Sequence, residues 1–319
     1  MGRVYVMTKL AYIKIFSYCG GMHLDTTAVY ADLPLTLSEA GTGRPVLILH
    51  GGGGPATVAG LARHLSRTAH TITPVHPGWD GTRRPAWLTG IDDLALTYLH
   101  LLHDRGLHDV LVVGSSLGGW TAAEMAVRDT AGIITGLVLI DAVGVHVDTE
   151  PITDFFALDP RGVAEHSWHD PDRYHLDPAA VPGDELSRRQ ANAATMRVLA
   201  GDPYMHDPKL LRRLGRVEVP ALLLWGESDR IVTPAYGAAY ADAFPEGRLE
   251  VIPRAGHLPQ IEQPEATHAA IETRLRRTTP RSVDAGSPVQ EQVQNQVQGQ
   301  VPEQVPESGG TGAAGPAPR

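Results

Sequence analysis

Short apolar runs rich in Val, Ile and Leu alternate with helical patterns between residues 28 and 277. The apolar runs lie at 44–50, 71–76, 110–114, 136–141, 220–226 and 248–253, and the clearest helical windows lie at 91–106, 117–130 and 263–277. Continuous runs of this length are typical of strands that are buried on both faces. The alternation therefore predicts an α/β fold, with a mostly parallel sheet covered by helices on both faces. Residues 28–43 predict an antiparallel pair at one edge of the sheet.

The alternation stops between residues 143 and 216, where proline is frequent, helical windows occur and no strong strand pattern is present. An insertion after a central strand lies over the carboxyl ends of the strands, where open α/β sheets hold their sites. We therefore expect a helical cap or lid at 143–216. It divides an α/β core into a first part, 23–142, and a second part, 217–279.

The two ends of the chain are expected to lie outside the core. Residues 1–22 resemble a signal peptide only superficially, because Lys14 interrupts the apolar patch and no cleavage pattern follows. We predict a leader that is not part of the fold, and Met22 is an alternative start of translation. Residues 280–319 are low in apolar content, and between 289 and 305 a valine stands at every fourth position in a repeat that glycine and proline interrupt, which predicts a disordered low-complexity tail. A role of this tail in binding a partner stays open.

Composition excludes several classes of function. The chain has 319 residues, 42% of them hydrophobic, which suffices for one large α/β domain with an insertion. The net charge is −9 and no dense basic stripe occurs, so nucleic acid is not an expected partner. The single cysteine, Cys19, excludes an intrachain disulfide framework and a Cys-rich zinc site. No apolar run is long enough to span a membrane, and we expect a cytoplasmic protein, with a homo-oligomer compatible.

The segment "LVVGSSLGGW" (111–120) places Ser116 at the centre of a G-x-S-x-G pattern, with Gly114 and Gly118 at its flanks. A β-branched run precedes this pattern and an Ala-rich helical window follows it. A sharp turn between strand and helix exposes its central side chain and crowds its neighbours, so small residues must flank it. The pattern predicts a nucleophilic serine. It also arises by chance in a chain with 34 glycines, so partner residues must decide.

A nucleophilic serine needs a base and a carboxylate. His257 follows the last predicted strand and precedes the last helix, which places it at the same sheet edge as Ser116. Asp229 follows the strand at 220–226 and is the favoured carboxylate. Glu227 and Asp141 remain alternatives.

Backbone amides at the same edge are candidates for stabilising a developing oxyanion. The "HGGGGP" segment (50–55) directly follows a strand, and we predict that Gly52, with Gly51 as an alternative, and Leu117 donate their N–H groups. Gly51, Gly53 and Ala56 also fit the dinucleotide-binding pattern G-x-G-x-x-A. That alternative is disfavoured, since it leaves the Ser, Asp and His unexplained.

The motifs "HGGGGP", "GSSLGG", "WGESDRIV" and "AGHLPQIEQPE", in this order, resemble the α/β-hydrolase family over residues 28–277. The resemblance implies an eight-stranded, mostly parallel sheet, a triad of Ser116, Asp229 and His257, no cofactor, and a helical cap inserted after the sixth strand. A serine at the turn departs from the dehalogenase and epoxide-hydrolase branches, which have aspartate there.

The carboxylesterases and the meta-cleavage-product hydrolases are the branches that this chain resembles most. The latter usually have Asn before the nucleophile and Trp after the catalytic His, whereas this chain has Ser115 and Leu258. We therefore expect a serine hydrolase that cleaves a small-molecule ester or lactone. Hydrolysis of a C–C bond is one alternative, and a small-molecule receptor on the same fold is another.

Residues that contact the substrate are predicted more loosely. Candidates are Gly51, Trp79, Trp120, Trp168 and Arg188, the last as a partner for a substrate carboxylate. The histidines of the inserted segment follow no metal-binding spacing, so we expect no metal site there.

Overall fold

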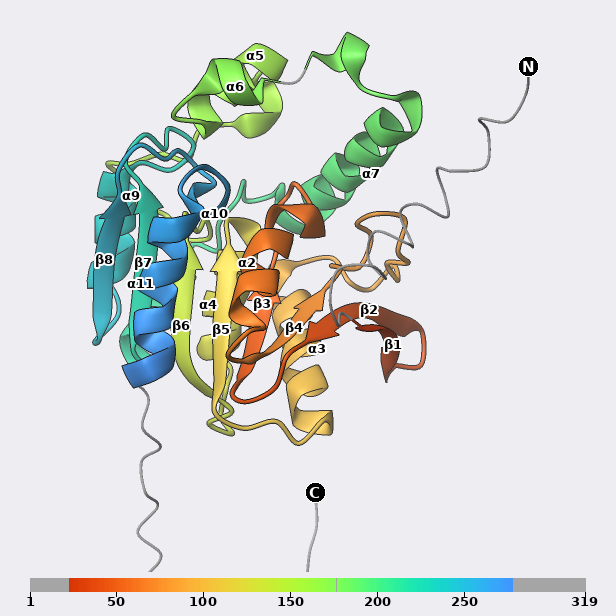
Figure 1. Cartoon of the computed structure of the whole chain (residues 1–319), viewed down its shortest axis with the longest axis vertical. Coiled ribbons are helices and arrows are strands. Elements are labelled where there is room, and N and C mark those ends of the chain that lie inside the picture. Colours follow the sequence, from red (N-terminus) through yellow and green to blue (C-terminus); the bar gives the residue numbers. More distant parts are fainter. Residues whose placement is uncertain (1–22, 176, 278–319) are drawn as a thin grey trace, which may run out of the picture. The chain divides into compact units, whose positions relative to one another are not determined.

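Eight strands form one sheet in the computed structural model, which describes residues 23–175 and 177–277. The strands are β1 (His23–Tyr30), β2 (Leu33–Ala40), β3 (Pro45–Leu49), β4 (His70–Pro74), β5 (Val110–Ser115), β6 (Ile134–Ile140), β7 (Ala221–Gly226) and β8 (Gly247–Ile252). Their order in the sheet is β1-β2-β4-β3-β5-β6-β7-β8, and all pairs from β4 to β8 are parallel (Figure 1). The strand β2 pairs antiparallel with β1 and with β4.

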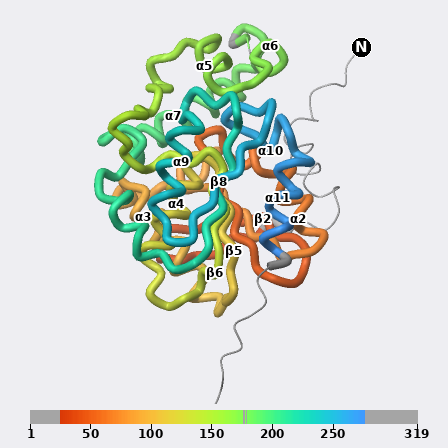
Figure 2. The backbone as a smooth tube through the Cα atoms, turned by 90° about the vertical axis from the view of Figure 1, so that its left-hand side faces the viewer, coloured from red at the N-terminus to blue at the C-terminus, as the bar shows by residue number. Residues whose placement is uncertain are grey.

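Successive side chains of the central strands pack into two separate cores, because residues of a strand alternate between the faces of the sheet. On β3, Leu47 and Leu49 face one core, and Val46 and Ile48 face the other. The helices α3 (Ile91–Asp104), α4 (Leu117–Ala126) and α9 (Pro234–Asp242) cover the first face. The helices α2 (Ala59–Leu65) and α11 (Pro264–Arg277) cover the second (Figure 2). Apolar residues at nearly every strand position are therefore required by burial on both sides.

The predicted fold class is confirmed. Each apolar run in the sequence forms a strand within a residue or two of its expected bounds, and the edge pair is the β1–β2 hairpin. The hairpin begins at His23, earlier than the pattern indicated. The helices α2 and α9 were not singled out, because both are short and contain glycine and alanine instead of a strong apolar stripe. The predicted leader and tail lie outside the described residues.

The chain between β6 and β7 is the longest connection in the described sheet, and we refer to residues 141–220 as the β6–β7 segment. Its helices are η2 (Phe155–Ala157), α5 (Pro160–Ser167), α6 (Pro171–Tyr174), η3 (Pro178–Ala180), α7 (Gly183–Ala200), α8 (Leu210–Arg213) and η4 (Leu214–Arg216). Figure 1 shows α5, α6 and α7 beyond the end of the sheet at which the parallel strands finish. Within the described residues, no helix has the length and apolar content that crossing a membrane demands.

Candidate active site at the carboxyl edge of the sheet

Ser116 lies at the turn between β5 and α4, with φ 54° and ψ −115°. A positive φ is uncommon for a residue with a side chain. The turn brings main chains so close that a Cβ on Gly114 would lie 2.2 Å from the carbonyl oxygen of Gly118. A Cβ on Gly118 would lie 2.3 Å from the carbonyl oxygen of Leu49. The crowding expected of the G-x-S-x-G turn is therefore present on both sides of the serine.

Ser116, His257 and Asp229 form a continuous line of hydrogen bonds, although they come from three separate loops. The Ser116 Oγ and His257 Nε2 atoms are 2.9 Å apart, and His257 Nδ1 is 2.8 Å from Asp229 Oδ2. An ionised carboxylate only accepts, so Nδ1–H donates to Asp229 and Nε2 is free to accept the serine proton. The other oxygen of Asp229 accepts the amides of Ile231 at 2.8 Å and Val232 at 3.2 Å, which hold the carboxylate in place.

The two alternative carboxylates occupy different surroundings. Glu227 is exposed, and its carboxylate accepts the amide of Arg254. Asp141 is fully buried at the end of β6, where an oxygen of Asp141, an oxygen of Asp229 and a ring nitrogen of His257 lie within 4.8 Å of one another. Burial, followed by the charge of Asp229, raises the pKa of Asp141 well above its ordinary value. Asp229 is thus the carboxylate in contact with His257.

The loop after β3 lies directly beside Ser116, since a Cβ on Gly51 would lie 3.0 Å from the Ser116 Cβ. Three successive carbonyl oxygens of this loop accept hydrogen bonds from side chains. His76 Nε2 donates to the His50 carbonyl at 2.8 Å, and His50 Nδ1 donates to the Gly51 carbonyl at 2.7 Å. Trp79 Nε1 donates to the Gly52 carbonyl at 2.9 Å. The amides of Gly52 and Leu117, the predicted oxyanion donors, donate to no acceptor of the described residues. The Gly51 carbonyl and the Gly52 N–H belong to one trans peptide and point in opposite directions, so the bond from His50 to the Gly51 carbonyl fixes where the Gly52 N–H is aimed, and the other two bonds hold the neighbouring peptides.

The two histidines of this loop region are neutral donors. The His76 amide donates to His50 Nε2 at 3.0 Å, so the proton of His50 sits on Nδ1 and reaches Gly51. Burial lowers the pKa of His50 to about 4, and burial together with His50 lowers that of His76 well below its ordinary value. Tyr98 completes this network of hydrogen bonds, since its hydroxyl donates to His76 Nδ1. The loop is therefore supported by a buried network whose protonation does not change near neutral pH.

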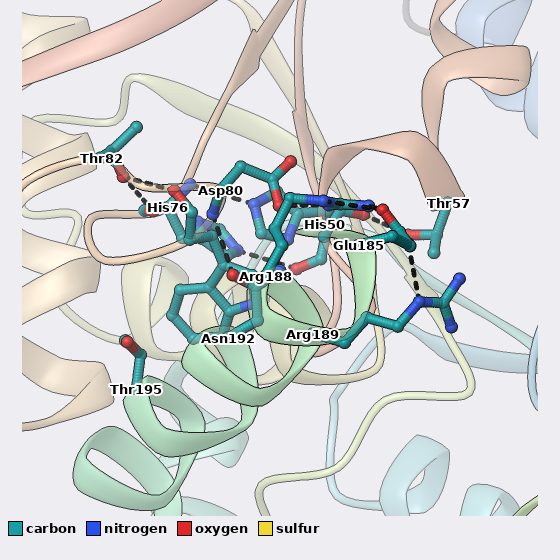
Figure 3. A network of polar contacts seen from close by, with 12 residues as sticks. His50, Thr57, His76, Asp80, Thr82, Glu185, Arg188, Arg189, Asn192 and Thr195 are labelled. Atoms are coloured by element: carbon teal, nitrogen blue, oxygen red, sulfur yellow. Dashed lines mark hydrogen bonds and ion pairs between the residues drawn. The ribbon is translucent and has the colours of Figure 1, made fainter. Parts of the chain in front are cut away.

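One face of α7 docks on this loop and on the turn after β4 (Figure 3). The amide of Asn192, which is 3% exposed, donates to Asp80 Oδ1 at 2.9 Å, and its oxygen accepts the Asp80 N–H at 2.9 Å. Arg188 forms ion pairs with Asp80 and Glu185. One turn further along, Met196 lies over Gly52, where a Cβ would come within 2.4 Å of its sulfur. The helix thus covers the loop that carries a predicted oxyanion donor.

The end of α5 contacts the loop that carries His257. The His257 amide donates to the Ser167 carbonyl at 2.7 Å. The Glu262 carboxylate accepts the Gly256 amide at 2.6 Å and the His169 amide at 3.0 Å, so it joins the two segments. The β6–β7 segment therefore contributes to the position of His257.

The predicted substrate contacts divide into two groups. Gly51 lies beside Ser116. Trp168 lies near the loop that carries His257, because it directly follows Ser167, whose carbonyl accepts the His257 amide. Trp79 and Trp120 are buried, with Trp79 supporting Gly52 and Trp120 donating to Glu124. Arg188 forms ion pairs with Glu185 of α7 and with Asp80 of the turn after β4. In this structure its side chain therefore holds α7 against that turn.

Sequence reasoning did not single out Asn192, Met196 or Glu262. Asn192 and Met196 lie at i and i+4 of a helix whose apolar stripe is weak, so the pattern gave little signal for them. Glu262 stood within the "AGHLPQIEQPE" motif, but its partners come from a distant segment.

Known proteins share sequence patterns and fold with this chain. A model of the family described as the Alpha/beta hydrolase family matches residues 46–270, a range that contains Ser116, Asp229 and His257. The 2-hydroxy-6-oxo-6-(2'-aminophenyl)hexa-2,4-dienoic acid hydrolase of Metapseudomonas resinovorans is 27% identical over 274 residues, which cover 81% of this chain and 89% of that protein. Lipase 1 of Psychrobacter immobilis is 22% identical over 70% of this chain and 74% of its own length. A solved thermophilic esterase from Thermogutta terrifontis has a TM-score of 0.62 at 25% identity, covering 81% of this chain and 98% of its own.

Proposed function

Because the chain belongs to the alpha/beta hydrolase family, we propose that it is a serine hydrolase that cleaves a small-molecule ester or lactone through an acyl-enzyme on Ser116. The observation that carries this proposal is the line of hydrogen bonds from Ser116 Oγ through His257 to the Asp229 carboxylate. This line joins a nucleophile, a base and an orienting group, which acyl transfer requires.

In the first step, the Ser116 Oγ attacks the substrate carbonyl carbon while its proton passes to His257 Nε2. Asp229 keeps the imidazole in the correct tautomer and stabilises the imidazolium that forms. The carbonyl oxygen gains negative charge, which the amides of Gly52 and Leu117 stabilise. The buried network behind Gly52 supports this role, because it holds the donor in advance of the reaction.

In the second step, the tetrahedral intermediate breaks the bond to the leaving alcohol, whose oxygen takes the proton from His257. Water then attacks the acyl-enzyme, with its proton going to His257 and onward to Ser116 Oγ as the acid leaves. For a lactone, the alcohol remains part of the released acid. The chemistry of these steps needs no cofactor.

We also assign residues 143–216 the role of a cap that limits the size of the substrate. Met196 over Gly52 and the contact of Ser167 with the His257 amide support this role, since both place the segment against the reacting groups. The backbone of Trp168 lies against Gly256, the residue before His257, and its ring stacks on Tyr174 with centroids 4.4 Å apart, so this ring pair is a candidate for an apolar wall of the substrate pocket.

Hydrolysis of a C–C bond is a second candidate, supported by the relative from Metapseudomonas resinovorans. That relative is named as a hydrolase of a 2-hydroxy-6-oxo-dienoic acid, so a 2-hydroxy-6-oxo-dienoate is a substrate to test beside esters. Ester hydrolysis demands less of the site, because the leaving group is an alkoxide that the imidazolium protonates directly.

A panel of substrates tests this proposal. The purified full-length chain is assayed with p-nitrophenyl esters of increasing acyl length, simple lactones and a 2-hydroxy-6-oxo-dienoate, beside the Ser116→Ala variant. We expect turnover of esters or lactones that Ser116→Ala abolishes. Faster turnover of the dienoate would favour C–C hydrolysis, and binding without any turnover would favour a small-molecule receptor.

A further inference from the structure

Asp141 is a buried acid that the proposed mechanism leaves without a role. It follows the end of β6 with φ 43°, a left-handed backbone that residues with side chains rarely adopt. Its side chain is 0% exposed, and its Oδ1 accepts the Gly226 amide at 2.8 Å. A strained backbone around a buried carboxyl group persists only where the surrounding structure holds it in place.

The second oxygen of the Asp141 carboxyl group indicates that this group is protonated. Asp141 Oδ2 is buried and has no hydrogen-bond donor among the described residues, and an oxygen of Asp229 lies within 4.8 Å of an oxygen of Asp141. Two carboxylates that share a buried space repel each other, and burial penalises each charge, so ionising both is strongly disfavoured. A proton on Asp141 removes the repulsion and turns the unpartnered oxygen into a donor to Asp229.

The donors around the pair decide which acid holds the proton. Asp229 accepts the amides of Ile231 and Val232 and the Nδ1–H of His257, all of which stabilise its charge. In the part of the chain that the structure describes, the Asp141 carboxyl group accepts only the Gly226 amide. Since hydrogen bonds to an ionised carboxylate favour the charged form, the charge belongs to Asp229 and the proton to Asp141.

We infer that Asp141 is a positioning residue that keeps a proton and donates it in a hydrogen bond to Asp229, so that Asp229 faces His257 as a singly charged, fixed carboxylate. The inference rests on the proposed function in so far as Asp229 is the acid of the triad. The two carboxyl groups, Asp141 and Asp229, then carry one negative charge between them. The Asp141 O–H holds Asp229 in addition to the imidazole of His257 and the amides of Ile231 and Val232.

Stability should report the proton on Asp141 independently of activity. In the unfolded chain an Asp loses its proton near pH 4, whereas the native state retains it to a higher pH. The native state then binds more protons than the unfolded state, so this group lowers stability as pH rises through that interval. The groups facing it are Asp229, His257 and, through its charge, Glu262.

Two substitutions distinguish the role of the side-chain hydrogen bonds of Asp141 from the role of its backbone conformation. In Asp141→Asn, the amide oxygen can accept the Gly226 N–H and the NH₂ can donate to Asp229, and Asn tolerates a positive φ. Asp141→Gly accommodates the backbone and removes both bonds. A purely structural role of the turn predicts that Gly is tolerated, whereas the positioning role predicts that Asn rescues what Gly loses.

The experiment combines infrared spectroscopy of the full chain with unfolding and kinetics. We expect a protonated carboxylic acid band at pH 7 that shifts in deuterated water and is absent from Asp141→Asn. The midpoint of unfolding of Asp141→Asn should rise relative to the wild type between pH 5 and pH 8, to an extent that grows with pH. On the substrate that Ser116 turns over, Asp141→Gly should lose about tenfold or more in kcat relative to Asp141→Asn, as the loss of a hydrogen bond to a charged group implies.

Absence of that band in the wild type, or a pH-independent difference in stability between the wild type and Asp141→Asn, would overturn the inference. Equal kcat of the Asn and Gly variants would also overturn it. If the chain turned over no substrate, the proposed function would fail, yet the infrared and unfolding results would still decide whether Asp141 holds the proton.

Discussion

Replacing Gly118 by alanine tests the geometry of the turn at Ser116 most severely. A Cβ at this position would lie 2.3 Å from the Leu49 carbonyl oxygen and 2.6 Å from that of His50, whereas real Cβ atoms stay at 3.0 Å or more from such neighbours. The main chain must therefore move by about 0.7 Å, the difference between 3.0 and 2.3 Å. Neither carbonyl can rotate away, since β3 and the His50 loop are held by the sheet and by the buried network.

The expected cost follows from two opposing effects. Gly118 lies in the helix α4, where alanine alone would stabilise by about 1 kcal/mol. Overpacking against fixed main chain costs roughly 1–3 kcal/mol or more, and here it also displaces the loop that carries Gly52. We expect net destabilisation of up to about 2 kcal/mol, which corresponds to a fall in Tm of up to roughly 8 °C for a chain of this size.

Gly60→Ala is the matched control, because Gly60 lies in the helix α2 and a Cβ there meets nothing within 4 Å. The same substitution in open space should stabilise by about 0.5–1 kcal/mol. Urea unfolding of both variants, with m-values compared, measures the difference. Gly118→Ala as stable as Gly60→Ala would refute the reasoning.

Three further substitutions test the surroundings of the site. Trp79→Phe removes the donor to the Gly52 carbonyl, and we expect kcat to fall about tenfold with little change in KM, less than the loss of an oxyanion donor itself. Asn192→Ala leaves the Asp80 amide without its acceptor and removes one donor from the Asp80 carboxylate, which keeps its ion pair with Arg188. The loss should cost about 1–3 kcal/mol in urea unfolding, and an unchanged midpoint would contradict the packing of α7 on this turn. Glu262→Ala removes the acceptor shared by Gly256 and His169, so kcat/KM should fall while Glu262→Gln retains part of it. Equal values for the two Glu262 variants would show that the carboxyl oxygen does not hold the His257 loop.

Local patterns in the sequence were sufficient to predict the sheet and to single out three residues, Ser116, Asp229 and His257, that the structure joins by hydrogen bonds. Strands buried on both faces require continuous apolar runs, so each run was visible without its neighbours. Ser116, Asp229 and His257 each follow a strand, and parallel strands bring their carboxyl ends to one edge. The topology therefore places these residues at one edge of the sheet.

The surroundings of the site could not be predicted in this way. Asn192 meets Asp80 across 112 positions and Glu262 meets His169 across 93, and neither pairing leaves a local pattern. Trp79 and Arg188 were expected to contact a substrate, because aromatic and cationic residues beside a site favour that interpretation. In the structure, the indole donates to Gly52 and the guanidinium is engaged by two carboxylates. Which partner such a side chain selects depends on how the β6–β7 segment folds back on the core.

Mass spectrometry after treatment with a fluorophosphonate, which reacts with activated serines, tests the central claim most directly. We predict a single adduct on Ser116 in the wild type, its absence in His257→Ala, and its retention in Ser115→Ala, whose side chain is buried beside Gln260. No adduct on Ser116 in the folded wild type, or labelling that His257→Ala leaves unchanged, would contradict the account.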